Sequence, residues 1–254
     1  MNQYKLLTPG PLTTTDTVKA VMQVDHCTWD DDYKTMTEDI RRRLLKLAHA
    51  GDDYGVVLMQ GSGTFGVESV LSSVPSKDDC VLVLVNGAYS VRQCEILERY
   101  GIAYRRLDFA WDEVPSAEKT AAFLDEHPEV TIVSMVHNET TTGIINDLGA
   151  IAAVAKPRGL AFFVDAMSSF GAVDIDVPKL GIDFIVSSAN KCIQGVPGFS
   201  YIIGRRDAIE ASNGQCPYGV ARPLRPMARN SKGRGQVALH VANARRRGLP
   251  SGAS

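Results

Sequence analysis

The chain has 254 residues, 44% hydrophobic and 22% charged with a formal net charge of −2, which supplies enough apolar material for one large core or for a large and a small domain. No apolar run approaches the roughly 20 residues that cross a bilayer, and the first residues lack the basic and then apolar pattern of a signal peptide, so we expect a cytoplasmic protein without a membrane anchor. The five cysteines are scattered, with no CxxC pair and no metal-ligand spacing, which argues against a disulfide framework and against a metal site.

Along residues 1–215, short apolar runs rich in β-branched residues alternate with segments that have helical spacing. This is the pattern of βα units around a mainly parallel sheet that is buried on both faces, so the predicted fold class is α/β. The predicted helices are 37–48, 64–74, 90–100, 117–126 and 148–156. The predicted strands are 56–59, 80–85, 131–136, 161–164, 184–186 and 200–203.

A glycine-rich segment, GSGTFG at 61–66, follows the first predicted strand and opens a helix. Such a turn offers free backbone N–H groups and the positive end of a helix dipole, which suits a phosphate. The hydroxyls of Ser62 and Thr64 fit a terminal phosphate monoester. A tight turn with a purely structural role is the alternative.

The same segment matches GxGxxG, the fingerprint of dinucleotide-binding folds, so a nicotinamide-dependent oxidoreductase is a competing hypothesis. That fold places an acidic residue at the end of the next strand to hold a ribose. Here the next strand ends in Val85 and is followed by Asn86 and Gly87, without a carboxylate. The hypothesis also leaves no role for the acid and the lysine described next.

Asp165 ends a predicted buried strand. An acid at the carboxyl end of a parallel strand faces the ligand crevice, and a buried acid requires a cationic partner. A protonated pyridine nitrogen would be such a partner. The alternative is that Asp165 caps a following helix.

Lys191 follows the next predicted strand, after small polar residues and before a Gly/Pro turn at 195–198. A lysine in such surroundings approaches a ligand closely and can form a Schiff base, although a single lysine is more often solvated. The order of the three features favours the first interpretation, because a phosphate loop is followed by an acid at one strand end and, 26 residues later, by a lysine at the next.

The last 39 residues, 216–254, contain eight of the 27 basic residues and none of the 29 acidic ones, which leaves 19 basic against 29 acidic residues in 1–215, a net charge of −10. This tail is rich in Arg, Gly and Pro and has no sustained periodicity, so we expect it to be disordered. A basic nucleic-acid-binding tail is the alternative.

Six motifs together resemble class V, fold-type I aminotransferases over residues 5–215. They lie at 8–11, 61–64, 86–89, 137–143, 164–166 and 187–191. The resemblance implies a pyridoxal 5′-phosphate cofactor and a large domain built on a mainly parallel seven-stranded sheet. Within the class, segments 8–12, 25–30, 138–143 and 190–198 are most similar to the members that transaminate 2-aminoethylphosphonate with pyruvate.

The resemblance also implies residue roles. Lys191 carries the cofactor and moves the proton, and Asp165 keeps the ring nitrogen protonated. Ser62, Gly63 and Thr64 hold the phosphate. Further cofactor-binding residues are Tyr89, which stacks on the ring unless it is a core aromatic, Thr140, directed at the ring hydroxyl, and Asn190, at the phosphate or the ring.

Members of the family are homodimers that bind small-molecule substrates, and neither a nucleic acid nor a membrane is an expected partner. They continue for about a hundred residues beyond position 215 with a small domain that supplies an arginine for the substrate carboxylate. Here the tail stands in that place, with the composition of a frame-shifted reading. We therefore expect a cofactor-binding domain at 1–215 without the small domain and with little activity. An alanine–glyoxylate or serine–pyruvate aminotransferase and a non-catalytic remnant are the alternatives, whereas a cysteine desulfurase usually has a histidine where this chain has Tyr89.

Overall fold

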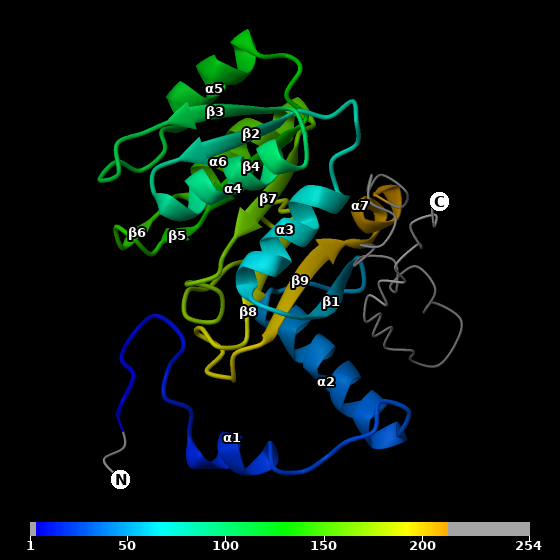
Figure 1. The fold of residues 1–254 in the computed structure, drawn as a ribbon. Coiled ribbons are helices and arrows are strands. Elements are labelled where there is room, and N and C mark those ends of the chain that lie inside the picture. Colours follow the sequence, from blue (N-terminus) through cyan, green and yellow to red (C-terminus); the bar gives the residue numbers. More distant parts are fainter. Residues whose placement is uncertain (1–3, 213–254) are drawn as a thin grey trace, which may run out of the picture.

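The computed structural model describes residues 4–212, and the predicted tail at 216–254 lies outside this range. A seven-stranded sheet forms the centre of the described part, in the order β1-β9-β8-β7-β4-β2-β3 (Figure 1). Strand β9 is antiparallel to both of its neighbours, and the other six strands share one direction. The strands are β1 (Tyr54–Gln60), β2 (Val81–Val85), β3 (Tyr104–Asp108), β4 (Ile132–Val136), β7 (Ala161–Asp165), β8 (Phe184–Ser188) and β9 (Phe199–Arg205).

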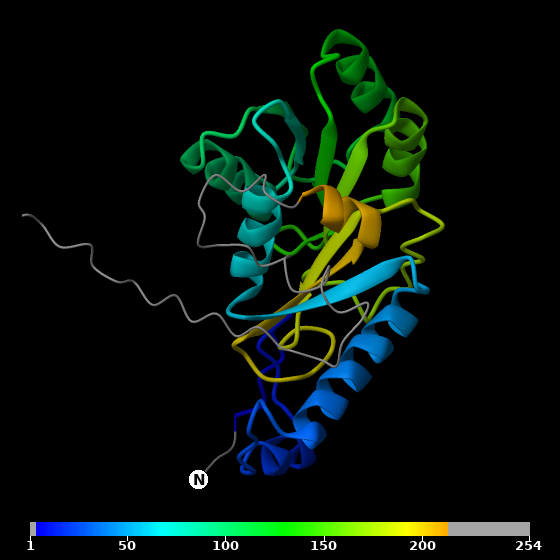
Figure 2. The ribbon, with the colours of Figure 1, turned by 90° about the vertical axis from the view of Figure 1, so that its right-hand side faces the viewer.

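Helices cover both faces of this sheet (Figure 2). On one face, alternate strand residues such as Val83 and Phe163 pack under α3 (Gly63–Ser73), α4 (Ala88–Arg99) and α7 (Arg206–Ala211). On the other face, Leu82 and Phe162 pack under α2 (Asp31–Leu47), α5 (Ala117–Glu126) and α6 (Leu148–Ala155), which a short 3-10 turn, η1 (Lys156–Arg158), extends. The continuous apolar runs of the central strands follow from this two-sided burial.

The predicted α/β fold with a mainly parallel seven-stranded sheet is confirmed. Each predicted helix and strand is present, with ends that shift by a few residues. The largest shift is in α2, which begins at Asp31 instead of residue 37, because Asp30 takes the N-cap position and Asp31 and Asp32 lie in the first turn.

Three kinds of element were not predicted from the sequence. Edge strand β3 consists of half-buried and exposed residues and carries two arginines, so it lacks the apolar run of the other strands. The short helices α1 (Asp16–Val21) and α7, and the two-residue strands β5 (Asn138–Glu139) and β6 (Ile144–Ile145), are too short for periodicity to reveal.

The strand order around the glycine-rich turn differs from that of a dinucleotide-binding fold. In such a fold the strand after the GxGxxG helix lies beside the first strand. Here β1 is an edge strand, and four strands separate it from β2. The GxGxxG match therefore marks a different kind of turn, and the oxidoreductase hypothesis loses its structural basis.

An N-terminal segment, residues 4–30, extends from the sheet and its helices (Figure 1). It contains α1, which has no buried residue, and it returns to the sheet edge at Gly10, next to Lys191. Within residues 4–212, every helix falls short of the length and apolar character of a membrane span.

Candidate active site

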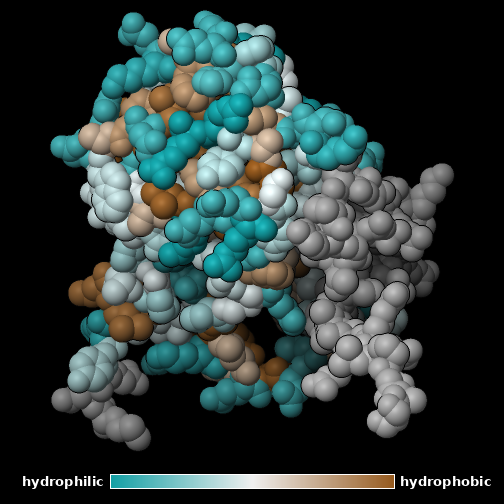
Figure 3. Space-filling view, turned by 45° about the horizontal axis from the view of Figure 1, so that its top comes forward, coloured by the Kyte–Doolittle hydropathy of each residue, from teal (hydrophilic) through white to brown (hydrophobic). Residues whose placement is uncertain are grey.

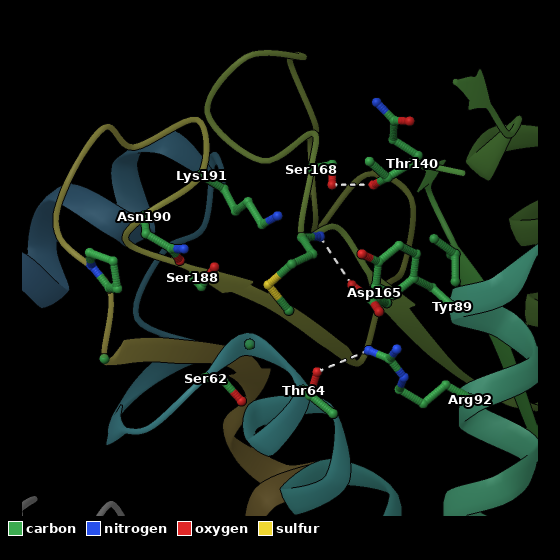
Figure 4. Close-up of a pocket in the computed structure, with 16 residues that line it drawn as sticks. Ser62, Thr64, Tyr89, Arg92, Thr140, Asp165, Ser168, Ser188, Asn190 and Lys191 are labelled. Carbon is green, nitrogen blue, oxygen red and sulfur yellow. Dashed lines mark hydrogen bonds between the residues drawn. The ribbon is translucent and has the colours of Figure 1, made fainter. Parts of the chain in front are cut away.

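A cavity of about 220 Å³ opens at the carboxyl ends of the parallel strands. All eight residues predicted to bind the cofactor line it (Figure 4), and they come from five separate parts of the fold. These residues are Ser62, Gly63, Thr64, Tyr89, Thr140, Asp165, Asn190 and Lys191. The sheet brings them together because the carboxyl ends of its parallel strands meet at one edge.

The turn between β1 and α3 forms one end of the cavity. Gly61 has φ of +134°, a left-handed conformation that favours glycine. Ser62 is the N-cap of α3, where its hydroxyl oxygen accepts a hydrogen bond from the Phe65 N–H at 3.2 Å and its own proton stays available for a ligand. A Cβ on Gly63 would lie 2.2 Å from the Met167 sulfur, so a larger residue there would displace the Met167 side chain. The backbone at the start of α3 is thereby open to an anion.

Asp165 lies at the end of β7 and is 4% exposed. Its Oδ1 accepts a hydrogen bond from the Met167 N–H at 3.0 Å, and no described cation forms an ion pair with it. Burial, helped by the negative charge of Glu139, raises the pKa of Asp165 from 3.8 to about 6. The helix-cap alternative is wrong, because no helix follows β7. The site therefore holds a buried acid that forms no ion pair within residues 4–212.

Lys191 lies in the loop after β8 and points into the cavity (Figure 4). Its Nζ donates a hydrogen bond to the Gly10 carbonyl oxygen at 3.2 Å. A Cβ on Gly10 would lie 2.4 Å from the Lys191 Cδ atom. The N-terminal segment thus packs directly on the lysine, a contact across 181 positions that no local pattern of the sequence could reveal.

Tyr89 lies in the first turn of α4, and its half-buried side chain lines the cavity, so it is not a core aromatic. The guanidinium of Arg92, one turn further along α4, lies 5.1 Å from the centre of the Tyr89 ring. Arg92 also donates a hydrogen bond to the Thr64 hydroxyl at 3.3 Å and makes no ion pair among residues 4–212. A cation at the positive end of α3 is unfavourable unless an anion lies between them.

Sequence reasoning missed Arg92, although its position three residues after Tyr89 on one helix face would have been the signal. It also missed three polar residues that line the cavity, Asn138, Ser168 and Ser188. The Ser168 hydroxyl is hydrogen-bonded to that of Thr140 at 2.5 Å. The buried Oδ1 of Asn138 and the buried hydroxyl of Ser188 have no hydrogen-bond partner within the described part of the chain. Unpaired polar atoms of this kind indicate a site that a polar ligand completes.

Comparison with known proteins gives a consistent result. A model of the class V aminotransferase family matches residues 19–219 of the chain. The chain is 50% identical over 225 residues to a 2-aminoethylphosphonate–pyruvate transaminase from Aeromonas hydrophila subsp. hydrophila, a match that covers 87% of this chain and 59% of the relative. The chain thus spans about three fifths of the length of this relative.

Solved structures with the same fold include other aminotransferases. A pyridoxamine–pyruvate aminotransferase from Mesorhizobium loti has a TM-score of 0.80 at 25% identity, with 87% of this chain and 57% of that chain covered. An alanine–glyoxylate aminotransferase from Nostoc sp. has a TM-score of 0.80 at 26% identity, with 88% and 59% covered.

Proposed function

Because the chain belongs to the class V aminotransferase family, we propose that it binds pyridoxal 5′-phosphate in the cavity described above, as the cofactor-binding part of an enzyme for transamination between 2-aminoethylphosphonate and pyruvate. The observation that carries the proposal is the buried carboxylate of Asp165, which forms no ion pair within residues 4–212, in one cavity with the Lys191 amine and the open start of α3. A pyridinium, an aldehyde and a phosphate ester match these three features in turn.

Several features of the cavity fit this cofactor. The unpaired Ser188 hydroxyl and Asn138 Oδ1 offer hydrogen bonds to a polar ligand. The start of α3 and the Arg92 guanidinium present N–H donors where a phosphate would lie. Asp165 lines the cavity, and its Oδ1 accepts a hydrogen bond from the Met167 N–H.

Each residue has a defined task in this proposal. The Lys191 Nζ would hold the cofactor covalently and would move the proton at the substrate carbon that bears the nitrogen. Asp165 holds the ring nitrogen in its protonated form, and Ser62, Gly63 and Thr64 bind the phosphate. The cofactor itself supplies an electron sink that stabilises negative charge at that carbon.

The remaining predicted residues orient the ring. Tyr89 stacks on one face of it, and Thr140, held by Ser168, directs its hydroxyl at the ring oxygen. Asn190, which precedes Lys191 in the chain and lines the same cavity, binds the phosphate or the ring of the cofactor. Precise placement of this kind lowers the barrier by fixing the reacting atoms before reaction.

The proposed overall reaction converts 2-aminoethylphosphonate and pyruvate into phosphonoacetaldehyde and L-alanine, and the cofactor would supply the carrier for the amino group. The choice of amino donor rests on the relative that is 50% identical. Alanine–glyoxylate transamination is the second candidate, and it rests on a structural relative at 26% identity. The first candidate is therefore the better supported.

We also propose a homodimer in the cytoplasm. The N-terminal segment exposes large apolar side chains, among them Leu7 at 91% and Trp29 at 71% exposure, and Figure 3 shows apolar surface in this region of the molecule. Exposed apolar surface of this extent is typical of protein interfaces. The described cysteines are free thiols, which suits a reducing compartment.

Covalent trapping tests the proposal. The chain mixed with pyridoxal 5′-phosphate and reduced with borohydride should carry one adduct, on Lys191, located by peptide mass spectrometry. Lys191→Ala should lose the adduct and keep part of the noncovalent affinity, because the phosphate and ring contacts remain. An adduct of normal yield in the variant, or tight binding of a dinucleotide by the unmodified chain, would overturn the assignment.

A further inference from the structure

Glu139 is a completely buried carboxylate to which the proposed reaction gives no role. It accepts three hydrogen bonds. Its Oε1 binds the Tyr89 N–H at 3.2 Å and the Thr141 hydroxyl at 2.9 Å, and its Oε2 binds the Ser90 N–H at 3.3 Å, while the Ser90 hydroxyl donates to the Gly87 carbonyl oxygen at 2.9 Å. An ionised carboxylate is an acceptor only, so its two oxygens match this set of donors.

The first contact of Glu139 is with the start of α4. Gly87 is the N-cap residue of that helix and has no side chain to bind the free N–H groups. Glu139 supplies the missing cap from a distance of 52 positions along the chain, and its negative charge lies at the positive end of the helix. The capped residues include Tyr89, the proposed ring-stacking residue.

The second contact is with the hairpin formed by β5 and β6. The Glu139 carbonyl oxygen accepts hydrogen bonds from the N–H groups of Thr142 and Gly143, at 3.1 and 2.8 Å, and so closes the hairpin turn. The neighbours of Glu139 on either side, Asn138 and Thr140, both line the cavity. One residue therefore joins two walls of the site, the one with Tyr89 and the one with Thr140.

We propose that Glu139 is a positioning residue that holds Tyr89 and Thr140 in the relative placement required to bind the cofactor ring. The inference rests on the proposed function, because it concerns residues assigned to the same cofactor. It goes further in assigning to a buried acid, which contacts no ligand itself, control over the geometry of the ring site.

Gly87 makes it possible to separate this role from simple helix capping. A Cβ at position 87 would lie 2.1 Å from the Glu139 Cγ atom, so a side chain fits there only when Glu139 is shortened. With Glu139→Ala, the variant Gly87→Ser gives α4 an N-cap of its own. The double variant therefore restores the cap and leaves the link to the hairpin broken.

The test uses the full 254-residue chain and measures the melting temperature and the dissociation constant for pyridoxal 5′-phosphate, together with the circular dichroism of the bound cofactor. Glu139→Ala should lower the melting temperature and raise the dissociation constant for pyridoxal 5′-phosphate by about 10-fold or more, the factor expected from losing charge-assisted hydrogen bonds. Glu139→Ala/Gly87→Ser should recover the melting temperature but not the affinity or the dichroism. Ser116→Ala, which removes the N-cap of the distant helix α5, is the control that lowers stability alone.

The outcomes separate the two claims. Recovery of affinity and dichroism together with stability in the double variant would reduce Glu139 to a helix cap and overturn the inference. Glu139→Gln is a second variant of nearly unchanged volume, whose NH2 group would face N–H donors. Unchanged affinity and dichroism in Glu139→Gln would likewise overturn it. A parent chain that takes up no cofactor would refute the proposed function, and this inference with it.

Discussion

Asp165 gives the site a pH dependence with a definite sign. Its pKa in the folded chain, about 6, lies above its ordinary value of 3.8, because burial disfavours the charged form. The folded state therefore holds the proton more tightly. The stabilising contribution of this group is full below about pH 4 and is lost as the pH rises through about 6. A shift of this size corresponds to about 3 kcal/mol.

Asp165→Asn should therefore act in opposite directions on stability and on cofactor binding. Without ligand, the variant should melt at a higher temperature than the parent chain at pH 8, and the difference should vanish near pH 4. Its affinity for pyridoxal 5′-phosphate should fall by at least about 10-fold, because a neutral amide does not balance a protonated ring nitrogen. Calorimetry at both pH values and a binding titration check the two effects. A variant that is less stable than the parent at pH 8 would contradict the assigned sign.

Arg92 should distinguish cofactors with and without a phosphate. Arg92→Met should lower the affinity for pyridoxal 5′-phosphate by about 10-fold, the effect of one charge-assisted contact. The affinity for unphosphorylated pyridoxal should stay nearly unchanged. Arg99→Met, at the other end of the same helix, is the matched control that should change neither affinity. An equal loss for both ligands would show that Arg92 acts through the Tyr89 ring instead. Fluorescence titration of each variant with both ligands gives the comparison.

At the scale of elements, the start of α3 combines a structural and a binding role in Ser62. Ser62→Ala and Ser116→Ala each remove a hydroxyl that caps a helix, and each should lower the free energy of unfolding by about 1 kcal/mol. Only Ser62→Ala should also lower the affinity for pyridoxal 5′-phosphate, since no residue of α5 lines the cavity. Denaturant titration and cofactor binding separate the two quantities. Equal cofactor affinity in both variants would exclude Ser62 from the phosphate site.

The elements also show why Asp165 and Lys191 belong to one site. Strands β7 and β8 are adjacent and parallel, so their carboxyl ends coincide. The segment between them returns the chain to the amino-terminal ends of the strands. Asp165 and Lys191 therefore line one cavity although they are 26 positions apart in the sequence.

At the scale of the whole molecule, the N-terminal segment should mediate association. The chain has two tryptophans, Trp29 in this segment and Trp111 in a loop, both exposed, at 71% and 54%. Trp29→Ser combined with Leu7→Ser should raise the dimer dissociation constant, whereas Trp111→Ser should not, because apolar side chains at an interface contribute most of its affinity. Sedimentation equilibrium measures both. A parent chain that remains a monomer at micromolar concentration would rule out the dimer.

Association should further affect the cofactor, because Gly10 in the same segment packs on Lys191. A segment held by a second copy keeps this contact ordered, so cofactor affinity in the parent chain should fall on dilution below the dimer dissociation constant. A cofactor affinity that does not change with protein concentration would show that dimer formation and cofactor binding are independent.

The sequence by itself determined the α/β class, the positions of six of the seven strands in the main sheet and the residues at the ends of β1, β7 and β8, because apolar periodicity and glycine turns are local signals. Motif order then indicated the family and the cofactor residues. Only the tertiary structure decided what depends on distant parts of the chain. It placed Gly10 on Lys191, Arg92 beside Thr64 and Glu139 at the start of α4, and it separated β1 from β2. Such contacts arise from the strand order and the packing of helices on a sheet, and neither leaves a pattern in neighbouring residues.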